Sequence, residues 1–186
     1  MAQVSATHLP GFVSISTEGR EIARYHFRGV WKPYLWPLMG PFGNVLRGAS
    51  GEHQHQSGLF FAYGGHGSTA GPTNIWSDWD EPPYGPCGKM LHLEFDRVEG
   101  GLASARIVEQ VLYVNGAGER ILDEVREITI TPLPEGECFV GLSRTVPTPS
   151  EPNGGPFMLS ARVCDALRAR DIRQKGEDGK WALIEG

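Results

Sequence analysis

The sequence "LASARIVEQVLYVNGAGERILDEVREITITPL", residues 102–133, holds two of the longest strand patterns of the chain and the turn between them. Residues 102–114 and 119–133 are rich in β-branched and apolar side chains, and the NGAGE segment between them offers Asn and Gly for the positive φ angles of a hairpin. A helix over the second segment would place a β-branched block, residues 128–131, directly before Pro132. The stretch therefore predicts a long antiparallel hairpin.

Other parts of the chain repeat this pattern of short strands and turns. Strand-like segments are "FVSIST" at 12–17, "EIARYHF" at 21–27, "GLFFAY" at 58–63, "KMLHLEFDRVE" at 89–99, "CFVGLSRTV" at 138–146 and "FMLSARVCDAL" at 157–167. The 25 Gly and 14 Pro residues disfavour a helical bundle. We predict an all-β protein, an antiparallel β-sandwich with long Pro/Gly-rich loops, as a single domain over residues 1–186 with a polar tail at 166–186.

Charge and hydropathy exclude several classes of protein. The 17 basic and 22 acidic residues give a formal charge of -5 without a basic run, so no nucleic acid is expected as a partner. No segment approaches the roughly 18 consecutive apolar residues of a membrane helix, and the N-terminus does not resemble a signal peptide. The sequence predicts a cytoplasmic protein without a membrane partner.

Three of the six histidines lie in "EHQHQSGLFFAYGGHG", residues 52–67. In an extended strand, His53 and His55 project to the same side with Cα atoms about 6.5 Å apart. His66 can fold back towards them if the glycines before it form a turn. This arrangement has three interpretations: a divalent metal held by His53 and His55, catalytic acid–base histidines without a metal, or an edge strand with polar side chains.

The loop "NIWSDWDEPPYGPCGK", residues 74–89, combines aromatic and acidic side chains. Sugars bind where their C–H faces stack on rings and carboxylates accept hydrogen bonds from their hydroxyls. Trp76, Asp78 and Trp79 are therefore candidate substrate-binding residues. The alternative is that both tryptophans cover the core and the acidic side chains face water.

Several other polar residues are candidates for the same site. Lys32 and Arg47 belong to "WKPYLWPLMGPFGNVLRG", residues 31–48, which we expect to be a long loop because its prolines exclude a helix. Either cation can hold an anionic or keto oxygen. His92 is a candidate substrate-binding residue on a strand, with a solvent-exposed position as the alternative. Glu124 and Arg126 share one strand face and predict a structural charge pair.

Four segments resemble the DUF6807 family, often labelled methane oxygenase PmoA or PmoA-like. They are "KPYLWPLMGPFGNVLRG", "EHQHQSGLFFAYG", "NIWSDW" and "LDEVREITI", and the resemblance covers roughly residues 22–165. The family's motifs fall on Lys32, Pro33, Tyr34, Pro37, Leu38 and Arg47, on Glu52, His53, Gln54, His55, Gln56, Gly58 and Leu59, and on Trp76. The chain departs from the family pattern at Gln54, Gln56 and Tyr63, where the family carries a proline and two further histidines.

The resemblance implies an all-β sandwich connected with bacterial carbohydrate catabolism. It also implies a longer C-terminal part, so that this chain is expected to be truncated. The PmoA label denotes a membrane-embedded copper oxygenase, and the sequence has no segment that fits such a protein. The family has no defined reaction, so the chemistry must be inferred from the residues.

The sequence therefore predicts an enzyme that acts on a sugar or keto-sugar by acid–base catalysis, as a lyase, hydrolase or epimerase. His53, His55 and His66 would transfer protons, and Lys32 or Arg47 would stabilise the developing oxyanion. The alternatives are a metal-dependent, cupin-like enzyme that uses His53 and His55, and a non-catalytic carbohydrate-binding domain. The expected ligand is a small carbohydrate-like molecule, and an exposed sheet edge would make the protein a homodimer.

Overall fold

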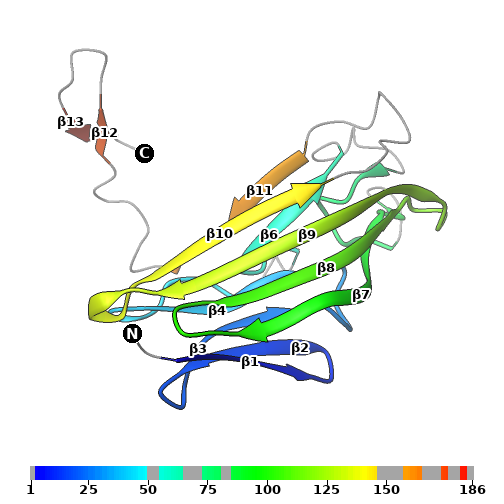
Figure 1. Ribbon diagram of the computed structural model, residues 1–186. Helices are drawn as coiled ribbons and strands as arrows, with labels where there is room; N and C mark the ends of the chain where they lie inside the picture. Colours follow the sequence, from blue (N-terminus) through cyan, green and yellow to red (C-terminus); the bar gives the residue numbers. More distant parts are fainter. Residues whose placement is uncertain are drawn as a thin grey trace.

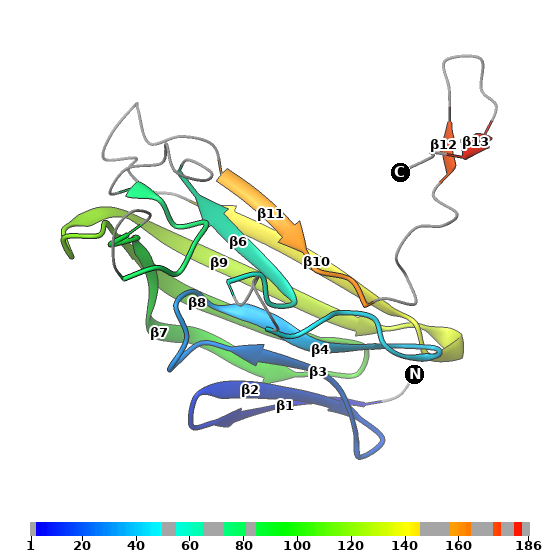
Figure 2. The same cartoon turned by 180° about the vertical axis from the view of Figure 1, so that it is seen from behind.

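The structure is a computed structural model that describes residues 3–49, 55–64, 73–80, 85–145, 157–164, 173–175 and 181–183. Two antiparallel sheets lie face to face (Figures 1 and 2), and the predicted all-β sandwich is confirmed. The strands are β1 Val4–Leu9, β2 Phe12–Thr17, β3 Arg20–His26, β4 Tyr34–Gly40, β5 Gly43–Asn44, β6 Leu59–Tyr63, β7 Lys89–Gly100, β8 Ala105–Val114, β9 Arg120–Pro132, β10 Cys138–Thr145, β11 Phe157–Ala161, β12 Arg173–Lys175 and β13 Trp181–Leu183.

The strand order follows the chain closely. One seven-stranded sheet has the order β1-β2-β3-β4-β6-β11, with β5 paired to β4, and a four-stranded sheet has the order β10-β9-β8-β7. Strands β12 and β13 form a separate two-stranded sheet. Neighbouring strands are mostly consecutive in sequence, as expected when tight turns connect antiparallel strands. No helix in the described parts of the chain is long and apolar enough to span a membrane.

The predicted hairpin of residues 102–133 forms β8 and β9. Its turn is held by the Asn115 side chain, whose Oδ1 accepts hydrogen bonds from the amides of Ala117 and Glu119, both at 2.9 Å. Gly118 adopts φ +81°, which a residue with a side chain rarely does. The burial of β8 alternates along the strand, so one face packs against the other sheet. The turn chemistry of the sequence thus sets the register of the two strands.

Residues 31–48, expected to be a loop, instead contain β4 and β5. The expectation was wrong because Pro37 lies where the strand needs no amide hydrogen bond. The pairing of β3 with β4 shifts register between Ala23↔Leu38 and Tyr25↔Leu35, so Trp36 and Pro37 lie at an irregularity of the ladder. A bulge is one of the few positions where a strand accepts proline.

The core between the two sheets is mostly apolar. Its larger cluster joins β2, β3 and β4 to β8 and β9, and a second cluster lies around Phe61, Met90 and Tyr113. Where the clusters meet, the interior holds charges, because β9 directs Glu124 and Arg126 between the sheets, each 1 % exposed. Arg126 Nε donates to Glu124 Oε1 at 2.7 Å, so the predicted charge pair is confirmed.

Candidate functional site

The site is built on the outer face of the seven-stranded sheet, which Figure 2 presents to the viewer. In β6, Phe61 faces the opposite sheet, where Arg126 packs over its ring, so Phe60 points the other way. Phe60 pairs with Tyr34 of β4, and Tyr34 pairs with His26 of β3. Register therefore places these three rings in one row across three neighbouring strands.

A cavity of about 220 Å³ opens above Tyr34 and Phe60 of this row. We call it the His55 pocket, and its lining includes Trp31, Lys32, Tyr34, His55, Phe60 and Asp78. These residues come from the β3–β4 connection, the start of β4, the segment before β6, β6 itself and the β6–β7 connection. A cavity with aromatic walls and a few converging polar groups is the usual form of a small-molecule site.

Among the described residues that line the pocket, the polar groups include one histidine, one carboxylate and one lysine, together with the hydroxyl groups of Ser57 and Tyr34. His55 Nδ1 lies 4.0 Å from Asp78 Oδ1, and the two side chains are 11 % and 29 % exposed. A carboxylate at this distance can orient the imidazole ring, and an imidazole can both accept and donate a proton. The pair can therefore accept a proton from a bound molecule and return it.

A buried asparagine shapes the loop that carries Asp78. Asn74 Oδ1 accepts hydrogen bonds from the amides of Trp76 at 2.9 Å and Ser77 at 3.3 Å, and the Asn74 carbonyl accepts one from Gly88. Such a side-chain turn fixes the backbone directly before Asp78. Asn74 was not among the residues expected in the site, although an Asn at the start of an irregular, aromatic segment is a recognisable turn signal.

Gly58 fixes the segment that carries His55. Its amide donates to the Arg47 carbonyl at 2.8 Å, and its φ is +60°. A Cβ atom at this position would lie 2.0 Å from the Leu35 carbonyl oxygen. Only glycine allows this close approach, which brings the chain before β6 against β4 and next to the pocket.

Lys32 is a buried cation at the wall of the pocket. The residue is 4 % exposed, and its Nζ donates to the carbonyl oxygens of Ile75, at 3.4 Å, and Trp76. The ammonium also lies 4.8 Å from the centre of the Phe60 ring. Burial lowers the pKa of Lys32 to about 8, although the nearby Asp78 and Cys87 oppose the shift. Lys32 can therefore exchange a proton close to neutral pH.

This shift predicts a characteristic dependence of stability on pH. Because the pKa of Lys32 is about 8 in the folded chain and near 10.5 when unfolded, the unfolded chain binds more protons between these values. The free energy of unfolding of the wild type, relative to Lys32→Met, should rise by about 3 kcal/mol from pH 7.5 to pH 10.5. Urea unfolding of both proteins at several pH values measures this difference. A constant difference would show that Lys32 titrates normally.

The structure brings only some of the predicted residues together. Lys32, His55 and Asp78 line one cavity, and Trp76 lies beside it with its ring centre 6.5 Å from that of His55. Trp76 also lines a neighbouring cavity of about 470 Å³ together with Gln56 and Arg162. His53 and His66 lie outside the described residues.

Three of the predicted substrate-binding residues have other positions. Trp79 is 48 % exposed, and its carbonyl accepts a hydrogen bond from the Cys87 amide. The backbone of Arg47 bonds to Gly58 and Arg162, and Arg47 is not among the described residues that line the His55 pocket. His92 lies between the sheets, where its Nδ1 is 2.7 Å from Glu109 Oε1, because β7 directs it inward.

The possible metal site was assigned to His53 and His55. Among the residues that the structure describes, no group of three or more His, Cys, Asp or Glu side chains is arranged to hold a metal ion. His55 and Asp78 are two side chains of the types that bind a divalent cation, and His53 is not described. The metal assignment therefore remains a prediction.

Comparison with known proteins gives a family and no function. No curated protein and no solved structure matches the chain. The model of a family of unknown function, DUF6807, matches residues 12–153. The matched range contains β2 to β10, every described residue of the His55 pocket and the charged interior of the sandwich. The chain therefore belongs to the DUF6807 family.

Proposed function

We propose that the protein acts on a sugar or keto-sugar bound in the His55 pocket, by proton transfer through His55. The observation that carries the proposal is the convergence of His55, Asp78 and Lys32 in one cavity with aromatic walls. Aromatic rings suit the C–H faces of a sugar, and the polar groups suit its oxygen atoms.

The residues have distinct roles in this proposal. His55 removes a proton from the carbon next to the substrate's carbonyl, and Asp78, 4.0 Å away, orients the imidazole and stabilises its charged form. Lys32 lies at the wall of the same cavity and interacts with the carbonyl, where negative charge develops. Elimination and epimerisation of keto-sugars both begin with this proton removal, so the proposal covers lyase and epimerase reactions.

Hydrogen exchange on the substrate tests this step without knowledge of the final product. Dihydroxyacetone, D-fructose and D-tagatose are incubated with the protein in D₂O, and proton NMR follows the loss of signal next to the carbonyl. We expect exchange faster than in buffer for at least one of them. Exchange should be unchanged in His8→Gln, because His8 lies on β1 against Phe27 and Phe95.

The same experiment distinguishes the other interpretations. Exchange that stops when a chelator is added and returns with a divalent metal would favour the metal-dependent enzyme. Sugar binding without exchange, lost in Trp76→Ala but kept in His55→Ala, would favour a non-catalytic carbohydrate-binding domain. The proposal would be contradicted if the protein neither bound any of these sugars nor accelerated their exchange.

A further inference from the structure

Lys32 is buried in the wall of the pocket, and an electrostatic role alone does not require this burial. Its side chain is buried against Phe60 and lines the cavity that His55 and Asp78 also line. A lysine that only neutralised charge could stay at the surface, as Lys89 does with 41 % of its side chain exposed. Desolvation of an amine in an apolar pocket is the usual way in which proteins make a lysine nucleophilic.

We propose that Lys32 forms an imine with the carbonyl carbon of the substrate, while His55 carries the protons. This inference rests on the proposed function and deepens it, because it replaces the electrostatic contact between Lys32 and the carbonyl with a covalent bond. It also restricts the substrate class to compounds with a free ketone or aldehyde.

The hydrogen bonds of Lys32 are compatible with an attacking amine. The neutral amine has two N–H bonds, and the carbonyl oxygens of Ile75 and Trp76 can accept both. The nitrogen lone pair must then point away from both carbonyls. Since the pKa of Lys32 is about 8, roughly half of the molecules carry the neutral amine at pH 8.

The reaction balances without any oxidant or reductant. The Lys32 nitrogen forms a bond to the carbonyl carbon as the C–O π bond breaks, and one proton moves from nitrogen to oxygen to give a carbinolamine. His55, as the imidazolium, then donates a proton to the hydroxyl group, which leaves as water while the C–N double bond forms. The protonated imine withdraws electrons from the neighbouring carbon, and neutral His55 can remove the proton there. The resulting enamine takes a proton back at carbon from His55, water then adds to the C–N double bond, and expulsion of the Lys32 amine from the carbinolamine releases the product.

Reductive trapping tests for the imine directly. The full chain is incubated with dihydroxyacetone and sodium cyanoborohydride at pH 7.5, and intact mass and peptide mapping follow the product. The chain has four lysines, Lys32, Lys89, Lys175 and Lys180, so each site can be assigned. We expect one adduct on Lys32, formed at least tenfold faster than on the other lysines, both in the wild type and in Lys89→Arg.

Other outcomes overturn the inference. If Lys32 of the wild-type protein is labelled no faster than Lys89, the imine inference is contradicted. This comparison needs no variant, so folding is not in question. Lys32→Arg adds a second test, because it keeps the positive charge but cannot form an imine. A folded Lys32→Arg protein should lose the adduct and the substrate exchange together, and full exchange in it contradicts the inference.

The result also separates this inference from the proposed function. If trapping at Lys32 fails while exchange proceeds and depends on His55, the imine is wrong and acid–base catalysis by His55 stands. If Lys32 is trapped but His55→Gln exchanges the substrate at the wild-type rate, the imine stands and the role of His55 is wrong.

Discussion

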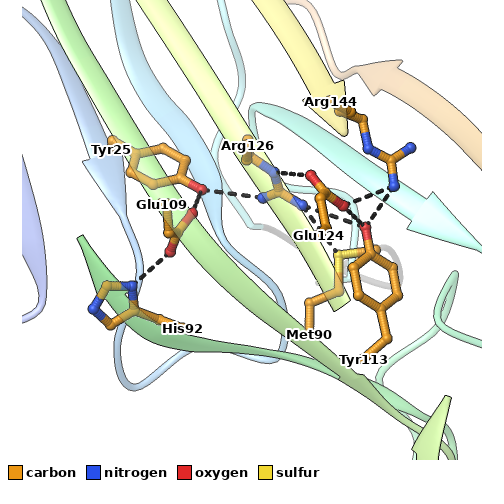
Figure 3. A network of polar contacts seen from close by, with 8 residues as sticks. All are labelled: Tyr25, Met90, His92, Glu109, Tyr113, Glu124, Arg126 and Arg144. Atoms are coloured by element: carbon orange, nitrogen blue, oxygen red, sulfur yellow. Dashed lines mark hydrogen bonds and ion pairs between the residues drawn. The ribbon is translucent and has the colours of Figure 1, made fainter. Parts of the chain in front are cut away.

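Arg126→Met should lower the free energy of unfolding by about 3–5 kcal/mol, because it removes one partner of a buried charge network and leaves the others uncompensated. Arg126 is 1 % exposed, and Figure 3 shows how its guanidinium lies between two carboxylate groups of the interior. Its Nη1 donates to Tyr25 Oη at 3.0 Å, and its Nε donates to Glu124. Methionine has a similar length but cannot donate a hydrogen bond.

The partners of Arg126 explain the size of this effect. Burial by itself would raise the pKa of Glu124, but Arg126 and Arg144 outweigh it and lower the pKa to about 2. Arg144 Nη2 donates to the other oxygen of Glu124 at 2.7 Å, and Tyr113 donates to the same oxygen. On the other side, Tyr25 links Arg126 to Glu109. Without Arg126, the buried Glu124 would rely on Arg144 and Tyr113, and the buried Glu109 on Tyr25 and His92.

A matched control uses an exposed arginine of similar geometry. Arg106 Nε donates to Glu127 Oε1 at 2.7 Å, but the two side chains are 40 % and 36 % exposed. Arg106→Met should therefore cost no more than about 1 kcal/mol. Urea unfolding of both variants, followed by tryptophan fluorescence, measures the difference. Equal effects in the two variants would contradict the account of the buried network.

His55→Gln should reduce substrate exchange by about 10²–10⁴-fold, which is the usual contribution of a general acid–base residue. Glutamine keeps the polarity and approximate size of the side chain but cannot take up a proton near neutral pH. The loss should appear in the maximal rate rather than in sugar binding, because the aromatic wall of Phe60, Tyr34 and Trp31 remains. NMR exchange rates over a range of sugar concentrations distinguish a lower maximal rate from weaker sugar binding.

Two variants provide the comparison for His55→Gln. Asp78→Asn should retain part of the exchange, because it alters the orientation and charge stabilisation of the imidazole but leaves its nitrogen in place. His26→Gln should have little effect on the chemistry, because His26 Nε2 bonds to the Trp36 carbonyl and its ring stacks on Tyr34 outside the pocket. An exchange rate in His55→Gln within threefold of the wild type would exclude His55 as the base.

Much of the fold follows from local features of the sequence. The NGAGE turn and the β-branched segments around it predict β8 and β9 because their turn chemistry and strand propensity agree. The β4 strand could not be predicted, since Pro37 disfavours a strand except at a bulge, and the bulge depends on pairing with β3. His92 points inward with Met90, in the regular part of β7 before its first register shift, while Leu91 and Leu93 are exposed, so the apolar pattern of this segment points to the wrong face.

The site was predictable in its residue types but not in its grouping. Lys32, His55 and Asp78 stand out as polar residues in aromatic segments of the chain, and all three line the His55 pocket. Their convergence comes from long-range contacts, such as the hydrogen bonds of Lys32 to the carbonyls of Ile75 and Trp76. Sequence alone gives no such contact between segments more than 40 residues apart.

A crystal structure of the protein soaked with a keto-sugar that it exchanges tests the central claim most directly. The account predicts the sugar in the His55 pocket, with its C–H groups against Phe60 or Trp31. Its carbonyl carbon should lie within bonding reach of Lys32 Nζ, and the neighbouring carbon should contact the His55 ring. A sugar bound on another face of the molecule, with the His55 pocket unchanged, would contradict the account.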